Sequence, residues 1–265
     1  AILEANNTVV EVIENEEDFT TDRLVAMDIL HQPERVIIEY NGMWLVSNFE
    51  KMQLPTGWGV EQQITCVDGS TFQMYMANMK SIFMDMIKNT DMVIFNRCKK
   101  EDPLPTYRRG IKVANQRAEV IFEDEEGELG DIFQDEMPFD MNAPVIEILP
   151  EDYGIWFVDA MDHPENYEGK TVKFKARVMK PRGMGSKFFV PGRTAMTCCA
   201  DDTTFLGYVC KSAYAPKLTP GEWVEVTAKV GIEKRNEYQG EEGIVLAAKH
   251  VEQCDPLEDE MVYFN

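Results

Sequence analysis

The sequence predicts an α+β protein, in which an N-terminal α+β domain is followed by a mostly-β domain that forms an OB-like, five-stranded barrel. Five strand patterns fall between residues 171 and 252, with turn-rich breaks between them. This spacing is typical of a small closed Greek-key barrel. The first half instead combines several short strand patterns with one long helical pattern. The hydrophobic fraction of 44% supplies enough apolar side chains for folded cores and excludes wholesale disorder.

The boundary between the two domains is predicted within residues 135–144, where two prolines follow an acidic run. The balance of acidic and basic residues also changes at this boundary. Residues 1–144 hold 12 basic and 27 acidic side chains, whereas residues 145–265 hold 14 and 20. Proline, aspartate and asparagine between patterned segments are typical of a linker. We therefore predict an acidic α+β domain over 1–144 and the barrel domain over 145–265.

The elements expected in the first half begin with a β-hairpin, because Asn41-Gly42 joins two β-prone runs. Apolar residues over 72–88 recur at helical spacing and predict the longest helix of the chain, whose methionines fit a core-facing role. Strands are expected at residues 35–41, 43–47, 60–66, 91–97 and 117–122.

The second half opens with a short helical pattern over residues 151–161, which leads into a turn. The strand patterns that follow are rich in β-branched and aromatic residues, and glycine, proline or aspartate bounds them. They cover residues 171–180, 188–199, 204–210, 223–232 and 243–252.

Charge and missing motifs exclude several classes of function. Lys and Arg number 26 against 47 for Asp and Glu, which gives a net charge of −21. Such a surface repels phosphate backbones and anionic lipids, so we expect no nucleic-acid partner and no direct membrane insertion. No uncharged apolar run reaches the roughly 20 residues of a membrane span. The sequence lacks CxxC, HExxH, GxGxxG, phosphate-loop and GxSxG motifs, so no enzyme activity is predicted.

The most distinctive local feature is a vicinal cysteine pair, Cys198-Cys199, within the run RTAMTCCADD. This run resembles the R-x-x-M-x-C-C-x-x-D signature of a bacterial membrane-protein family, the YcgQ-type subunits of a two-component permease complex. The motif residues are Arg193, Met196, Cys198, Cys199 and Asp202. The runs NYEGK at 166–170, GEWVEV at 221–226 and VYFN at 262–265 fit the same family.

The resemblance covers residues 150–265 and departs from the family at Asp201, where a small residue is expected. Residues 1–144 have no counterpart that aligns. Family members carry N-terminal membrane helices and hold the C-terminal region outside the cytoplasm. The resemblance therefore implies the extracytoplasmic region of a membrane-anchored subunit at the cell membrane, a non-enzymatic interaction or ligand-binding module whose partner is a permease subunit. The start at Ala1, without methionine or a signal-peptide charge pattern, is expected of an excised region.

A second hypothesis is a thiol-based metal-binding or redox protein centred on Cys198 and Cys199. Neighbouring residues of a strand point to opposite faces, so one thiol is expected in the barrel core and the other outside. Three roles stay open: simple packing, a strained vicinal disulfide, or a metal site in which Cys198, Cys199 and Asp202 are ligands. Thiolates favour soft ions such as copper(I) or zinc, so the cofactor of such a site would be a soft metal ion.

Three further features have both a structural and a functional interpretation. Arg193 is about six strand residues, or roughly 20 Å, from Cys199. A direct pair along one straight strand is therefore excluded, and an ion pair between Arg193 and a surface carboxylate is expected. The acidic run 119–131 resembles a calcium loop but lacks its terminal glutamate, so an acidic hairpin turn is favoured. Trp58, between two glycines, is expected to anchor a loop, with a ligand-binding tip as the alternative.

Overall fold

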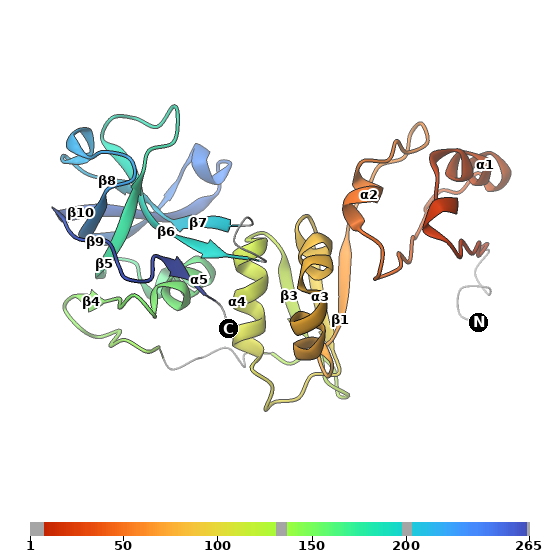
Figure 1. The fold of residues 1–265 in the computed structure, drawn as a ribbon, viewed down its shortest axis with the longest axis horizontal. Helices are drawn as coiled ribbons and strands as arrows, with labels where there is room; N and C mark the ends of the chain where they lie inside the picture. Colours follow the sequence, from red (N-terminus) through yellow and green to blue (C-terminus); the bar gives the residue numbers. More distant parts are fainter. Residues whose placement is uncertain (1–7, 131–136, 198–202, 264–265) are drawn as a thin grey trace.

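The chain folds into a small three-stranded sheet with helices, followed by a closed barrel, as Figure 1 shows for the computed structural model. The structure describes residues 8–130, 137–197 and 203–263. The α-helices are α1 (Thr21–His31), α2 (Val46–Glu50), α3 (Phe72–Ile87), α4 (Leu104–Ala114) and α5 (Tyr153–Asp162). Single 3-10 turns cover Glu16–Asp18, Pro164–Asn166, Ala215–Lys217 and Asn236–Tyr238. The strands are β1 (Ile64–Asp68), β2 (Met92–Asn96), β3 (Glu119–Phe122), β4 (Ile146–Glu147), β5 (Thr171–Met179), β6 (Phe188–Met196), β7 (Thr203–Gly207), β8 (Val209–Lys211), β9 (Trp223–Lys234), β10 (Glu242–Gln253) and β11 (Met261–Val262).

Strands β1, β2 and β3 form a parallel sheet in that order. Parallel neighbours need a crossover connection, which α3 supplies between β1 and β2 and α4 supplies between β2 and β3. Aromatic rings fill the core beside the sheet: Phe95 stacks on Phe122 and meets Phe72 edge to face, with centroids 4.8 and 4.9 Å apart. Met84 of α3 is buried in this core whereas Met74 is exposed, so the methionines serve the expected packing role only in part.

Helix α4 lies outside the elements that the sequence predicts. Its buried side chains Leu104, Tyr107 and Ile111 recur at helical spacing. Two prolines at its start, Pro103 and Pro105, mask this pattern, although proline in the first turn of a helix is well tolerated.

The predicted hairpin over residues 35–47 is wrong. Asn41 does form a turn, since its Oδ1 accepts a hydrogen bond from the Met43 N–H at 2.9 Å and its carbonyl accepts one from Trp44. The second predicted strand runs into helix α2, where the Ser47 N–H donates to Asp85 Oδ2 of α3 at 3.0 Å. Docking of α2 on α3 therefore removes the partner strand, and residues 35–40 enter no sheet.

The C-terminal barrel confirms the predicted OB-like class, because each of its five strands has two neighbours. β9 pairs antiparallel with β5 and β10, β10 pairs in parallel with β8, and β6 pairs antiparallel with β8 and β5. β7 extends the pairing of β6, while β4 and β11 add short parallel edges. The third predicted strand is divided at Tyr208 into β7 and β8.

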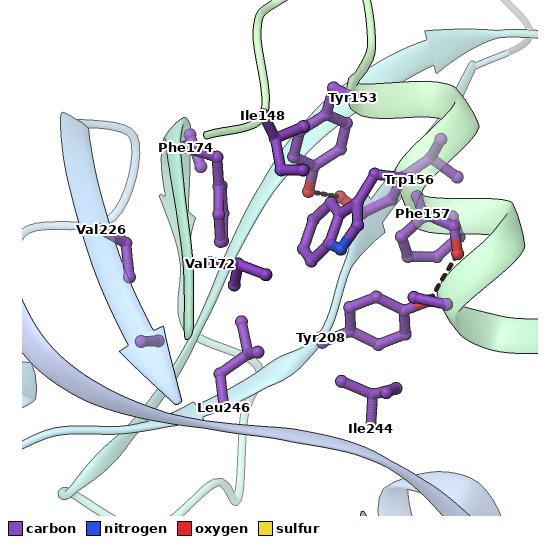
Figure 2. Packing of buried hydrophobic residues seen from close by; sticks show 14 of the residues in the cluster. Ile148, Tyr153, Trp156, Phe157, Val172, Phe174, Tyr208, Val226, Ile244 and Leu246 are labelled. Atoms are coloured by element: carbon purple, nitrogen blue, oxygen red, sulfur yellow. Dashed lines mark hydrogen bonds between the residues drawn. The ribbon is translucent and has the colours of Figure 1, made fainter. Parts of the chain in front are cut away.

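Helix α5 covers the barrel interior with three aromatic side chains, Tyr153, Trp156 and Phe157, as Figure 2 shows. The Tyr153 hydroxyl donates to the Leu206 carbonyl at 3.0 Å, and the Tyr208 hydroxyl donates to the Phe157 carbonyl. These bonds satisfy the polar ends of otherwise apolar rings, as buried tyrosines require. The predicted helix over 151–161 therefore closes the barrel.

Strands β6 and β7 approach closely at a pair of glycines, Gly192 and Gly207. A Cβ on Gly192 would lie 2.3 Å from the Leu206 carbonyl oxygen, and one on Gly207 would lie 2.7 Å from the Pro191 carbonyl oxygen. Only glycine allows two backbones to approach this closely.

The two halves of the chain meet where α4 packs on α5. Arg108 Nη1 lies 2.7 Å from Asp162 Oδ2, and Lys112 Nζ lies 3.6 Å from the other carboxylate oxygen. Val113 of α4 joins the barrel cluster, whereas the aromatic core beside the parallel sheet is a separate cluster. The predicted division into domains at residue 144 stays a prediction.

Candidate functional site

Strand β6 carries the first half of the cysteine motif, and Arg193 is its most extensively bonded residue. Arg193 is only 2% exposed. Its Nη1 donates a hydrogen bond to the Pro150 carbonyl, and its Nη2 donates to the carbonyls of Asp259 (3.0 Å) and Met261 (2.9 Å). The guanidinium also lies over the Tyr153 ring, 5.6 Å from its centroid. One arginine thus joins β6 to the segment before α5 and to the C-terminal strand β11.

The expected ion pair between Arg193 and a surface carboxylate is wrong. The acceptors are backbone carbonyls, which suit a planar guanidinium with several donors in fixed directions. Burial lowers the pKa of the guanidinium, against the opposing effects of Tyr153 and Asp259. Its Nε has no hydrogen-bond partner among the described residues. Arg193 therefore positions strands and has no exposed donor with which to hold a ligand.

The β6–β7 pair brings the two ends of the motif segment together. Met196 pairs with Thr203 at the end of the ladder. Paired residues of an antiparallel ladder are about 5 Å apart. Met196 and Thr203 are therefore close in space, although six residues separate them in the sequence. These six residues include the predicted metal ligands Cys198, Cys199 and Asp202, which lie outside the described residues. The metal site stays a prediction.

The other four cysteines lie within the described residues as free thiols. Burial raises the pKa of the Cys98 thiol to about 11 and that of the Cys210 thiol to about 12. Both are therefore protonated at neutral pH and poor nucleophiles. Cys66 is exposed on β1, and burial raises the pKa of the half-buried Cys254. Within the described ranges, no group of three or more His, Cys, Asp or Glu side chains could hold a metal ion.

The two remaining candidates from the sequence have structural roles. The acidic run after β3 forms the expected hairpin turn, in which Glu123 bridges Glu128 and Asp124 Oδ1 accepts a hydrogen bond from the backbone of the turn. Trp58 anchors its loop as expected, since its Nε1 donates to Asp28 Oδ1 of α1 at 2.9 Å.

A small cavity between α4 and α5, with both charged and apolar lining residues, was not anticipated from the sequence. Its lining includes Arg108, Arg109, Asp159, Asp162 and His163. Its volume of about 30 Å³ has room for little more than a water molecule. The cavity is therefore too small for a metabolite and marks the contact between the two halves of the chain.

This chain is an OB-like barrel protein, because its five strands close into a barrel that a helix caps. A buried arginine holds the strand that leads to the cysteine pair. The chain belongs to the family described as the DUF1980 C-terminal domain, whose model matches residues 128–264. The matched region contains the whole barrel, α5 and the motif strand. No curated protein matches the chain.

Solved structures resemble parts of the chain only weakly. The mitochondrial single-stranded DNA binding protein Rim1 of S. cerevisiae is 11% identical, with 33% of this chain and 97% of that one covered and a TM-score of 0.21. An aspartyl-tRNA synthetase from Entamoeba histolytica is 15% identical, with 44% of this chain and 27% of that one covered and a TM-score of 0.24. Likenesses at this level carry no argument about function.

Sequence reasoning missed the residues that hold Arg193. Tyr153 and the Pro150 carbonyl lie some 40 residues before it, while Asp259 and Met261 lie more than 60 residues after it. Backbone acceptors have no sequence signature. The arginine inside a strand of apolar and small residues was the one available signal, because a strand position facing the core demands internal partners for a charge.

Proposed function

We propose that this chain is the extracytoplasmic region of a membrane-anchored subunit of a permease complex, where it acts as a non-enzymatic interaction or ligand-binding module. Family membership over residues 128–264 and the resemblance of the Arg193–Asp202 run to YcgQ-type subunits support this proposal. Within the described part of the chain, none of the helices combines the length and apolar character that a membrane span needs.

The bonding of Arg193 is the observation that carries the non-enzymatic part of the proposal. Catalytic arginines present donors to a substrate, whereas this one directs Nη1 and Nη2 to three backbone carbonyls of its own chain. Arg193 is then a structural brace for the barrel, whose surface a partner subunit would contact. The net charge of −21 supports a protein partner and disfavours nucleic acid and anionic lipid.

The location can be tested with a membrane-impermeant maleimide on intact cells that make the full-length protein. Cys66 is exposed, so it should be labelled without lysis if this region lies outside the cytoplasm. Cys66→Ser is the matched variant that identifies the labelled thiol. Labelling at Cys66 only after lysis would contradict the proposed location. The permease partner is tested separately, by co-purification of a membrane transporter subunit with the full-length protein and its loss after charge changes on the barrel surface.

A thiol-based soft-metal or redox function is the second candidate. The Met196–Thr203 pair supports it, because this pair brings together the two strand ends that precede and follow Cys198, Cys199 and Asp202 in the sequence. Metal analysis of the purified protein should find copper(I) or zinc if thiolates bind a soft ion. Cys198→Ser and Cys199→Ser should each abolish the signal.

The matched control for the metal test is Cys254→Ser, because Cys254 is half-buried and lies outside the motif. Equal metal content in all three variants would reject the site. If the pair is structural instead, one thiol should react with iodoacetamide in the native protein and the other only after unfolding.

We also propose that the chain is divided into two domains near residue 144. Two hydrophobic clusters support the division, although the barrel cluster extends back to Phe139 and takes in Val113. Limited proteolysis should cut first within residues 131–144 and leave two compact fragments. First cuts within residues 171–252 would contradict the division.

A further inference from the structure

The segment Arg35-Val-Ile-Ile-Glu39 lies between α1 and α2, in the part of the molecule far from the barrel (Figure 1). It belongs to no helix, strand or turn, and all five residues are exposed. Ile37 is 82% exposed, while Val36 and Ile38 are 41% and 37% exposed. Three consecutive β-branched residues have a strong preference for strand structure, and Ile37 in particular leaves most of its apolar surface in water.

The backbone of this segment is also unpaired. Among the described residues, no backbone hydrogen bond involves residues 35–39. The side chain of Arg35 reaches only Glu61, at 3.9 Å, and both side chains are largely exposed. An apolar, β-prone segment with free N–H and C=O groups is a candidate for pairing with another strand.

The residues around the segment form only a small aromatic cluster, in which Tyr40 packs against Phe19, Trp44 and Phe49, and Val36, Ile37 and Ile38 stay exposed beside it. Over residues 8–60, only Phe19, Leu24 and Pro55 are buried, and none of them belongs to either large hydrophobic cluster. A strand partner must therefore come from outside this part of the chain.

The order of side chains in the segment is self-complementary. In an antiparallel pair of two copies related by a two-fold axis at Ile37, Arg35 of each copy lies opposite Glu39 of the other. Val36 then lies opposite Ile38, and Ile37 lies opposite its own counterpart. Opposite charges and β-branched residues facing each other across strands are stabilising pairs. A two-fold interface needs such a self-complementary surface.

We propose that residues 35–39 form a two-stranded antiparallel ladder with the same segment of a second copy of this chain. Because side chains alternate between the faces of a strand, one face of the ladder carries the two Arg35–Glu39 pairs around the Ile37–Ile37 pair, and the other face carries the two Val36–Ile38 pairs. Five residues a side make a small interface, and the net charge of −21 on each copy opposes approach. The dimer is therefore weak, and its formation requires high protein concentration.

Sedimentation equilibrium at rising concentration tests the proposal through charge reversal. Arg35→Glu places two Glu–Glu pairs in the ladder, and Glu39→Arg places two Arg–Arg pairs there. Each variant alone should raise the dimer Kd by about tenfold or more. An equimolar mixture of the two variants restores both opposite-charge pairs and should form a heterodimer. The double variant R35E/E39R should again form a homodimer.

Two exposed residues of the same region serve as controls of equal charge change, Lys51→Glu for R35E and Glu14→Arg for E39R. Both should dimerise like the unaltered chain. A monomer at all concentrations would overturn the proposal, as would closure of the segment onto β1 of its own chain. Failure of the two variants to associate in the mixture would also overturn it. An equal increase of the dimer Kd in the two control variants would do the same, since general charge effects would then explain the weaker association.

Discussion

Replacement of Arg193 by methionine should release the C-terminal strand from the barrel. Methionine has a similar length but no donor, so the carbonyls of Pro150, Asp259 and Met261 all lose their guanidinium partner. β11 pairs with β6 through only two residues, Met261 and Val262. Without the arginine, the strand keeps only this short pairing and the burial of Val262 in the barrel core.

The magnitude follows from the three hydrogen bonds. Hydrogen bonds of charged groups contribute about 1.5–3 kcal/mol each. The smaller contribution per hydrogen bond applies here, because Pro150 and Asp259 are exposed residues whose carbonyls can form hydrogen bonds with water instead. Removal of a buried charge also returns part of its desolvation cost. We therefore expect Arg193→Met to lower the free energy of unfolding by about 3 kcal/mol, or the Tm by roughly 10 °C for a domain of this size.

Urea denaturation measures the loss, and hydrogen exchange locates it. Backbone amides of residues 261–262 should lose protection in Arg193→Met before those of β9 and β10. Arg182→Met is the matched control, since Arg182 is exposed in the loop between β5 and β6 and should be replaceable without measurable change. A loss below about 1 kcal/mol, with 261–262 still protected, would refute the role assigned to Arg193.

Three other outcomes are expected. Gly192→Ala should destabilise the barrel by about 3 kcal/mol or more, as a thermal melt would show, because its Cβ would lie 2.3 Å from the Leu206 carbonyl oxygen. Gly59→Ala is the control and should leave the Tm unchanged, because its Cβ would have no atom within 4 Å. The pKa of Cys210 rises on folding from 9.0 to about 12, so the unfolded chain loses this proton first and stability should fall above pH 9 by about 1.4 kcal/mol per pH unit. Cys98, whose pKa is raised to about 11, adds a slope of the same sign, so Cys210→Ala should reduce the fall in stability between pH 8 and pH 10 without removing it. Urea denaturation at the two pH values measures the difference, and an unchanged slope in Cys210→Ala would contradict the assignment. Fluorescence anisotropy should detect no binding of single-stranded DNA at moderate salt, because each phosphate contact needs a cation that this surface lacks; a micromolar, salt-sensitive Kd would reject that view.

The barrel could be predicted from the sequence because five β-prone segments recur at short spacing between turn signals, and two of them, β5 and β9, also alternate apolar with polar residues. Burial along β5 and β9 follows this alternation, with Val172, Phe174, Val224 and Val226 inside. Strand order could not be predicted in the same way, since the parallel pairing of β8 with β10 joins segments more than 30 residues apart. The cysteine pair could be identified as a candidate site from the sequence alone, whereas its chemistry depends on residues that fold around it.

The sequence by itself therefore determined the α+β class, the helix α3, the barrel strands, the acidic turn and the absence of the sought catalytic motifs, because these follow from local periodicity and composition. Only the tertiary structure decided the role of Arg193 and the state of residues 35–47. A buried guanidinium takes its acceptors from wherever the fold brings carbonyls together, here from residues 150, 259 and 261. A β-prone segment becomes a strand only when a neighbouring backbone offers hydrogen bonds, and the docking of α2 on α3 removed the neighbour that Asn41-Gly42 would have supplied.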